Sequence, residues 1–164
     1  MKSITKTAII TGAGSGIGLA VAHTFVREGT NVVLNGRSED KLTRAATQIG
    51  QPDRLAIVVG DVTRPETVDQ IVDAAGERFG QVDILVNNAS IFHTKPFTEY
   101  SVGELDSFLS YLRGTFVLSQ ATVRQMRRQG QGGAIVNIGT ILASNGVYGL
   151  PSSAPIAAKG ASRH

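Results

Sequence analysis

The stretch TAIITGAGSGIG, residues 7–18, decides the fold of this 164-residue chain. Residues 7–11 form a short apolar, β-branched run that is typical of a buried strand, and a glycine-rich turn follows it directly. After the turn, Ile17, Val21 and Phe25 recur at a spacing of four, which predicts an amphipathic helix. Glycines in such a turn permit a tight bend and let an anion approach the helix N-terminus. The stretch therefore predicts a strand–loop–helix unit with an anion-binding loop.

The rest of the chain repeats this alternation of strand and helix. Further strands are predicted at 31–35, 55–59, 83–87 and 134–138. One helix is predicted at about 39–49, and another over the long apolar repeat from Leu105 to Met126. A further helix is predicted to begin after Thr63, which would be its N-cap in a capping box with Glu66. From Gly139 onward the composition predicts a loop, with one helical turn near residues 157–159. We expect one Rossmann-type, doubly wound α/β domain over residues 1–164, with a parallel sheet covered on both faces.

Composition excludes several classes of protein. The chain has no cysteine, which excludes disulfides, thiolate metal sites and a cysteine nucleophile. Its net charge is only +3, and Arg124, Arg127 and Arg128 lie where a helix should end, so we expect no nucleic-acid partner. No apolar run is long enough for a membrane span, and the first residues lack a signal-peptide core. We expect a cytoplasmic protein without a metal site or a membrane partner.

The glycine spacing Thr11-Gly12-xxx-Gly16-x-Gly18 resembles the cofactor loop of the short-chain dehydrogenase/reductase family. Four further stretches are similar to motifs of the same family, in the same order. They are Gly60-Asp61-Val62, Asn87-Asn88-Ala89-Ser90, Arg113-Gly114-Thr115-Phe116 and Ile135-Val136-Asn137-Ile138-Gly139. The resemblance covers essentially the whole chain and implies a Rossmann-type sheet. Five strands are present of the family's seven, so we expect a C-terminally incomplete domain.

By this resemblance, the N-terminal half implies a nicotinamide dinucleotide cofactor. The resemblance implies that Asp61 holds the adenine amine and that Val62 lies against the adenine ring. The diphosphate would be wrapped by Gly12, Ser15, Gly16, Ile17 and Gly18, and the path to the nicotinamide ribose would be lined by Asn88 and Ala89.

The end of the second predicted strand bears on the choice between NADP and NAD. An acidic residue here would bind the ribose 2′-hydroxyl of NAD. Gly36 takes that place and Arg37 follows, whose guanidinium could pair with a 2′-phosphate. We therefore expect NADP to be favoured, with NAD possible. The alternative is that Arg37 is only a solvated loop charge.

The catalytic half departs from the family pattern. The family uses a tyrosine, a lysine four residues later, a serine, and an asparagine on the long helix. Lys159 matches the lysine, which also grips the ribose, and Thr140 keeps a hydroxyl at the serine position. The tyrosine position holds Pro155 and the asparagine position holds Tyr111. Pro155 has no proton to give, so the usual acid–base group is missing.

Three side chains are candidates for a replacement proton donor. Tyr111 is more typical of a packed helix residue, Tyr148 of a loop aromatic and His93 of a solvated loop histidine. The resemblance implies an NAD(P)-dependent oxidoreductase that acts on an unidentified carbonyl or alcohol. The alternative is a catalytically silent dinucleotide-binding protein or a truncated remnant. The long helix also suggests a homo-oligomer, and residues 134–138 would form an apolar edge strand.

Overall fold

The computed structural model describes residues 5–143 and 149–161. The main elements are β1 (Thr7–Thr11), α1 (Gly16–Arg27), β2 (Asn31–Gly36), α2 (Glu39–Ile49), β3 (Leu55–Val59), α3 (Pro65–Phe79), β4 (Ile84–Asn87), α4 (Val102–Arg128), β5 (Ala134–Asn137) and α5 (Ser153–Gly160). Short 3-10 turns span Pro52–Arg54, Phe97–Glu99 and Ile141–Ala143. Within these described ranges, no helix is both long enough and apolar enough to cross a membrane.

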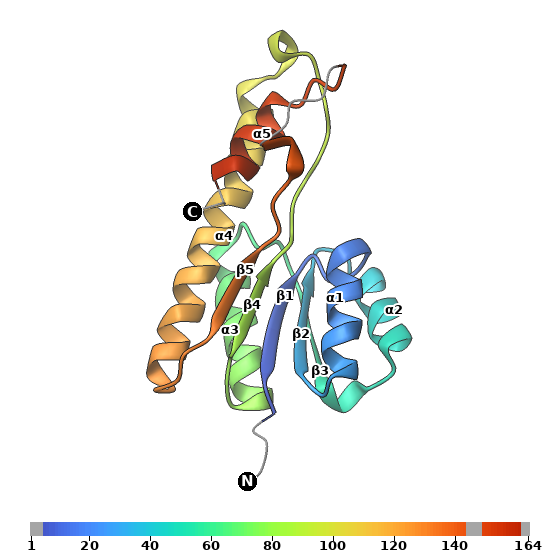
Figure 1. Cartoon of the computed structure of the whole chain (residues 1–164), viewed down its shortest axis with the longest axis vertical. Coiled ribbons are helices and arrows are strands. Elements are labelled where there is room, and N and C mark those ends of the chain that lie inside the picture. Colours follow the sequence, from blue (N-terminus) through green and yellow to red (C-terminus); the bar gives the residue numbers. More distant parts are fainter. Residues whose placement is uncertain (1–4, 144–148, 162–164) are drawn as a thin grey trace.

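The five strands form one parallel sheet in the order β3-β2-β1-β4-β5 (Figure 1). Ile9 of β1 lies between Val33 of β2 and Leu85 of β4, and all three side chains are buried. The direction of strand succession reverses between the neighbouring strands β1 and β4. In a doubly wound sheet this reversal opens a crevice at the carboxyl ends of the strands. The predicted Rossmann-type α/β fold is confirmed.

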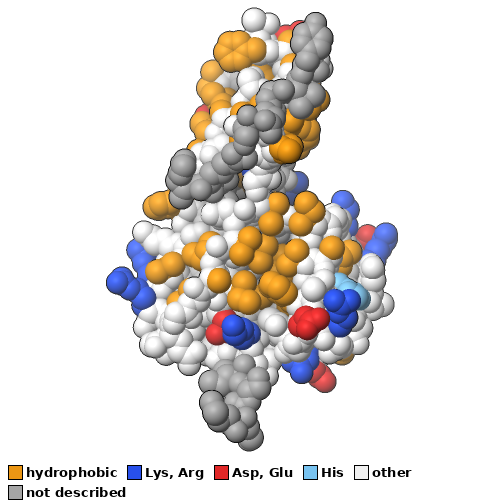
Figure 2. All heavy atoms as spheres, in the orientation of Figure 1, with side chains coloured by type: hydrophobic (Ala, Val, Ile, Leu, Met, Phe, Trp, Pro, Cys, Tyr) orange, Lys and Arg blue, Asp and Glu red, His pale blue; other side chains and the backbone are white. Residues whose placement is uncertain are grey.

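Helices cover the two faces of the sheet unequally. α1 and α2 pack on one face, while α3 and α4 pack on the other (Figure 1). Each face has its own buried hydrophobic cluster, and alternate residues of the central strands contribute to one cluster or the other. β5, however, exposes all four of its residues. The expectation of cover on both faces is therefore right for the central strands and wrong for β5. Figure 2, which has the orientation of Figure 1, shows hydrophobic side chains at the surface of the face that is turned toward the viewer.

One local prediction at a helix end needs correction. α3 begins at Pro65 with Arg64 as its N-cap, without a capping side chain, so the capping box at Thr63 is wrong. Proline is favoured at the first helical position, and the Thr63 N–H is instead taken by the carboxylate of Asp61 at 2.9 Å. A capping box does occur at α4, between Ser101 and Glu104.

The C-terminal helix is longer than the single turn predicted. α5 has eight residues and packs on the N-terminal half of α4, beyond the carboxyl ends of the strands (Figure 1). Phe108 of α4 joins Ala154 and Ala158 of α5 in a third, small hydrophobic cluster. This packing brings Lys159 close to the end of β5.

Candidate functional site

A cleft of about 630 Å³ lies at the carboxyl ends of β1 to β4. Its walls are the loops that follow these strands, together with the first turn of α2 and one side chain of α4, Tyr111. Its position is the point where the strand order reverses, and its volume suits a small-molecule ligand. The fold therefore places one large cleft where the sequence predicts the cofactor.

The glycine loop between β1 and α1 forms one wall of this cleft. Gly12 and Gly16 have φ angles of 65° and 56°, which L side chains rarely adopt. A Cβ at Gly18 would collide with the carbonyl oxygen of Gly12 and lie 2.7 Å from the Asn88 amide nitrogen. Gly18 thus allows α1 to pack against the loop. Ser15, the N-cap of α1, makes no side-chain hydrogen bond to the helix, so the N–H groups of the first turn are open to an anion.

A network of hydrogen bonds joins this loop to the segment after β4. The Asn88 side-chain amide donates to the carbonyl oxygens of Thr11 at 3.0 Å and Gly12 at 3.2 Å. In return, the Thr11 hydroxyl oxygen accepts from the backbone N–H groups of Asn88 and Ala89, at 3.0 and 2.9 Å. The two walls of the cleft are therefore held at a fixed separation. Thr11 was not singled out from the sequence, although a polar residue that ends an apolar strand is a usable signal.

The end of the cleft beside β2 and α2 carries positive charge. Arg37, Ser38 and Lys41 line it, and Gly36 places no side chain there. Asn35 donates to the carbonyl oxygens of Val58 and Gly60, at 3.1 and 3.2 Å, and so fixes the end of β2 against β3. Sequence reasoning found Arg37 but missed Ser38 and Lys41, which the first turn of α2 brings to the same place.

The cofactor residues predicted from the sequence fall into two groups. Those that line the cleft are Gly12, Ser15, Arg37, Asp61, Val62, Asn88 and Ala89. Gly16, Ile17 and Gly18 are not among the lining residues, and Ile17 is exposed. Their N–H groups nevertheless belong to the open first turn of α1. The cofactor roles of both groups stay predictions.

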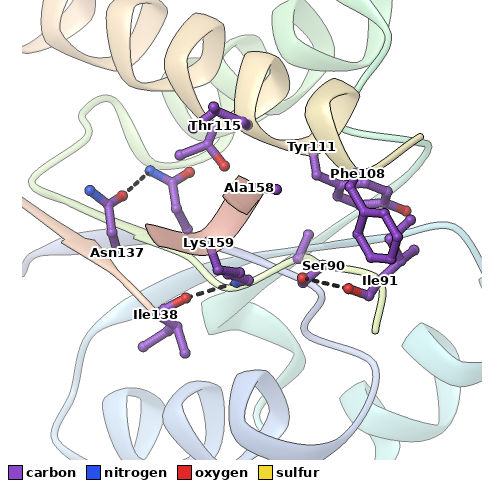
Figure 3. Close-up of a pocket in the computed structure, with 12 residues that line it drawn as sticks. Ser90, Ile91, Phe108, Tyr111, Thr115, Asn137, Ile138, Ala158 and Lys159 are labelled. Atoms are coloured by element: carbon purple, nitrogen blue, oxygen red, sulfur yellow. Dashed lines mark hydrogen bonds between the residues drawn. The ribbon is translucent and has the colours of Figure 1, made fainter. Parts of the chain in front are cut away.

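Lys159 lies in a second, much smaller cavity of about 20 Å³ next to the cleft (Figure 3). Its ammonium group donates to the carbonyl oxygen of Ile138 at 2.8 Å. Burial lowers the pKa of Lys159, because desolvation disfavours the charged form. Pro155 is buried in α5, four residues before Lys159 and so on the same face of the helix. The structure therefore confirms that Pro155 and Lys159 lie one helical turn apart, and the proline ring carries no acidic proton. The catalytic roles that the resemblance implies for these two positions stay predictions.

The other catalytic candidates are scattered. Thr140 follows β5 and its hydroxyl oxygen accepts from the Leu142 N–H at 3.3 Å; Thr140 is not among the described residues that line either cavity. His93 is likewise outside both linings, and its ring lies 4.7 Å from that of Phe108. Tyr148 lies outside the described residues.

Of the two replacement candidates that the structure describes, Tyr111 reaches the site and His93 does not. Tyr111 lines both the cleft and the small cavity. Burial, together with the negative charge of Asp61, raises the pKa of Tyr111, while Arg37 opposes that rise. A raised pKa makes a tyrosine a weaker acid, which is the opposite of what the family reaction needs. Tyr111 is therefore poorly suited to replace the missing proton donor.

Comparison with known proteins decides the family. The family model described as short chain dehydrogenase matches residues 6–164. This chain belongs to the short-chain dehydrogenase family. An uncharacterized oxidoreductase of Staphylococcus aureus strain MRSA252 is 40% identical over 137 residues, which cover 83% of this chain and 58% of the relative. One of Staphylococcus saprophyticus is 38% identical over 140 residues, 59% of its length. The chain thus spans a little under three fifths of these relatives.

Solved structures of family members agree with the fold. A short-chain dehydrogenase/reductase of Brucella melitensis, described as a glucose/ribitol dehydrogenase, superimposes with a TM-score of 0.87 at 31% identity, over 98% of this chain and 67% of that one. A 3-ketoacyl-(acyl-carrier-protein) reductase from the same organism, complexed with NADH, gives a TM-score of 0.88 at 32% identity, over 98% and 66%. A family member from Mycobacterium marinum gives 0.91 at 28% identity, over 98% and 64%. The resemblance inferred from the five sequence motifs is confirmed.

Proposed function

We propose that this chain binds the dinucleotide of an NADP-dependent oxidoreductase that acts on a carbonyl or alcohol substrate. The observation that carries the proposal is the cleft itself, with an uncapped first turn of α1 at one end and Arg37 at the other. The names of the relatives, which are oxidoreductases, and the family neighbour complexed with NADH support it. The substrate class is taken from the family alone.

The residues of the cleft fit a dinucleotide. The positive φ of Gly16, with open space around it, leaves room for a diphosphate beside the N–H groups of the first turn of α1. Asp61 lies in the cleft beside buried Val62, where it can accept from an adenine amine. When bound, the nicotinamide group supplies hydride transfer to or from a substrate carbon. The protein residues bind, orient and supply or accept the proton.

The preference for NADP rests on the local charge. Arg37 and Lys41 face the cleft, and a guanidinium can bind a phosphate through two parallel hydrogen bonds. Asp40 lies nearby in the first turn of α2, but Arg44 pairs with it at 2.8 Å. Glu39 is in the same turn and does not line the cleft. The net field at this end therefore favours a ligand that carries the additional 2′-phosphate.

Titration with NADPH and NADH tests this proposal. Loss of a charged hydrogen bond costs about 1.5–3 kcal/mol, so Arg37→Ala should weaken NADPH binding by about 10- to 150-fold. NADH binding should hardly change. Arg27→Ala is the control, because Arg27 lies at the C-terminal end of α1, away from the cleft. Equal affinities of the unmutated chain for the two cofactors would overturn the proposed preference.

For catalysis, we propose that Lys159 and Thr140 serve the proton transfer and that Pro155 limits its rate. General acid–base help is worth about 10²–10⁴-fold, and Pro155 supplies none. Pro155 also favours the second candidate function, a dinucleotide-binding protein without turnover, whereas the names of the relatives favour an oxidoreductase.

A chimaera separates these two functions. The chain would be extended by the C-terminal part of a longer relative, with and without Pro155→Tyr, and NADPH oxidation would be measured with carbonyl substrates. We expect Pro155→Tyr to raise turnover by about 10²-fold or more. Equal, robust turnover with Pro155 retained would show that another group supplies the proton.

We also propose a homo-oligomer that forms through α4. Exposed apolar side chains recur every seven residues along this helix, at Val102, Leu109, Phe116 and Val123. A seven-residue apolar repeat is the pattern by which two helices pack side by side, so a second copy of α4 is its natural partner. Sedimentation of the chain should show a dimer or larger assembly, and Phe116→Lys should shift it toward the monomer. A monomeric unmutated chain would contradict the proposal.

A further inference from the structure

The position of Tyr111 is fixed by a close approach of α4 to the cleft. A Cβ added at Gly114 would lie 2.7 Å from the carbonyl oxygen of Val62 and 3.3 Å from the Cα of Thr63. α4 therefore touches the turn after β3 backbone to backbone. Tyr111 lies three residues earlier on the same face of the helix, so it points to the same side. Its ring packs against the hydrophobic cluster that contains Val62.

Tyr111 lies on the boundary between the two cavities. Both cavities are lined by Ala89, Ser90 and Tyr111, and only Tyr111 of these has a large side chain. Arg37 lies on the side of the large cleft, whereas Lys159 lies on the side of the small cavity. Figure 3 shows Tyr111 and Phe108 on one side of the small cavity and Lys159 on the other. The aromatic ring of Tyr111 is thus the largest side chain on the boundary between the cleft and the cavity that holds Lys159.

The two compartments differ strongly in size. The cleft measures about 630 Å³ and the small cavity about 20 Å³. A cavity of roughly 10–15 Å³ holds one water molecule, so with the side chains in their present positions the small cavity is too small for a nicotinamide ring. The part of the site that is open for a ligand is the part that runs from the glycine loop to Arg37.

We infer that Tyr111 acts as a partition that leaves a ready site for the adenosine-phosphate half of the dinucleotide only. The inference rests on the proposed function and deepens it. Adenosine 2′,5′-bisphosphate, a ligand with an adenine, a ribose and two phosphates, should occupy the cleft without any movement of the protein. The nicotinamide half must displace the Tyr111 ring before it can approach Lys159, and this cost offsets the contacts that it gains. Tyr111 thereby determines how strongly the site favours the whole dinucleotide over its adenosine-phosphate half.

Calorimetric titration with adenosine 2′,5′-bisphosphate and NADPH tests the partition. In the unmutated chain the two dissociation constants should agree within about threefold. Tyr111→Ala should tighten NADPH binding by about tenfold and leave the bisphosphate unchanged, because only the nicotinamide half gains space. Tyr111→Phe is the matched control: it keeps the ring, so its two affinities should match those of the unmutated chain.

The outcomes separate the inference from the proposed function. NADPH binding tenfold or more tighter than the bisphosphate in the unmutated chain would overturn the partition, as would an unchanged ratio of affinities in a folded Tyr111→Ala variant. Binding of neither ligand would overturn the proposed function itself, and the partition with it. If Tyr111→Ala does not fold, the fluorescence emission of NADPH bound to the unmutated chain tests the partition instead. We expect it to match free NADPH because the nicotinamide stays in water, and a strong blue shift would overturn the inference.

Discussion

Gly114→Ala should destabilise the protein, although alanine is the better helix former. α4 contacts the turn after β3 at this point, and the added Cβ would lie 2.7 Å from the Val62 carbonyl oxygen and 3.1 Å from its carbonyl carbon. These neighbours are backbone atoms, which cannot rotate away as the end of a flexible side chain could. The helix must therefore shift, and α4 would lose part of its contact with the cleft.

The magnitude follows from two opposing terms. Overpacking of a well-filled interior costs about 1–3 kcal/mol. Replacing glycine by alanine within a helix gains about 1 kcal/mol. Gly76→Ala in α3 is a matched control, because the nearest atom to its added Cβ is the end of the Gln125 side chain at 4.0 Å. The helix gain is common to both variants, so their difference in unfolding free energy measures the clash alone.

Thermal unfolding followed by circular dichroism provides the assay. For a chain of this size, 1 kcal/mol shifts Tm by about 2–4 °C, so Gly114→Ala should melt about 2–12 °C below Gly76→Ala. Gly76→Ala itself should melt slightly above the unmutated protein. Equal melting temperatures of the two variants would refute the close approach of α4 to the cleft.

Three further predictions concern other parts of the molecule. Thr11→Val removes the acceptor of two backbone N–H groups and should lower the free energy of unfolding in urea by about 1–3 kcal/mol. Thr24→Val on the exposed face of α1 should have little effect, and equal losses in the two variants would contradict the bracing role of Thr11. Hydrogen bonds from the Ser101 N–H and Lys95 lower the pKa of Glu104 from 4.5 to about 2, so its stabilisation is complete above pH 4.5 and is lost as the pH falls towards 2. Glu104→Gln should make the unfolding midpoint depend less on pH over this range. An unchanged dependence of the midpoint on pH would argue against these hydrogen bonds. The unmutated chain should aggregate in light scattering because the edge strand β5 is exposed, and Val136→Lys should reduce this aggregation. A monodisperse, unmutated monomer would contradict this prediction.

The sequence predicted the sheet because its signals are local. Short β-branched runs, each bounded by a turn and followed by an amphipathic repeat, placed all five strands within one residue of their observed ends. The glycine loop and Arg37 were found for the same reason, because a strand end and a helix start fix the position of the residues between them. Where the fold is a repeat of one unit, the pattern within each unit is sufficient.

What the sequence could not predict depends on contacts between distant segments. The hydroxyl of Thr11 braces residues that lie 77 and 78 positions away, and no local pattern reveals that pairing. The role of Gly114 is equally hidden, since only the approach of α4 to Val62 shows why a side chain cannot fit there. The α3 cap was mispredicted because Pro65 takes the first helical position and the Asp61 carboxylate accepts from the Thr63 N–H. Tyr111 could be placed on its helix, but not on the boundary between two cavities.

The most direct test of the account follows the backbone amide signals of the labelled chain by NMR during titration with NADPH. The uncapped first turn of α1 and the Arg37 end of the cleft are the two places where the dinucleotide is expected to bind. We predict that the amide signals of Gly16, Ile17 and Gly18 shift together with those of Arg37 and Ser38. The exposed end of α1 near Arg27 should be unaffected. Shifts confined to other surfaces, with the glycine loop unchanged at saturation, would contradict the central claim that this loop binds the dinucleotide.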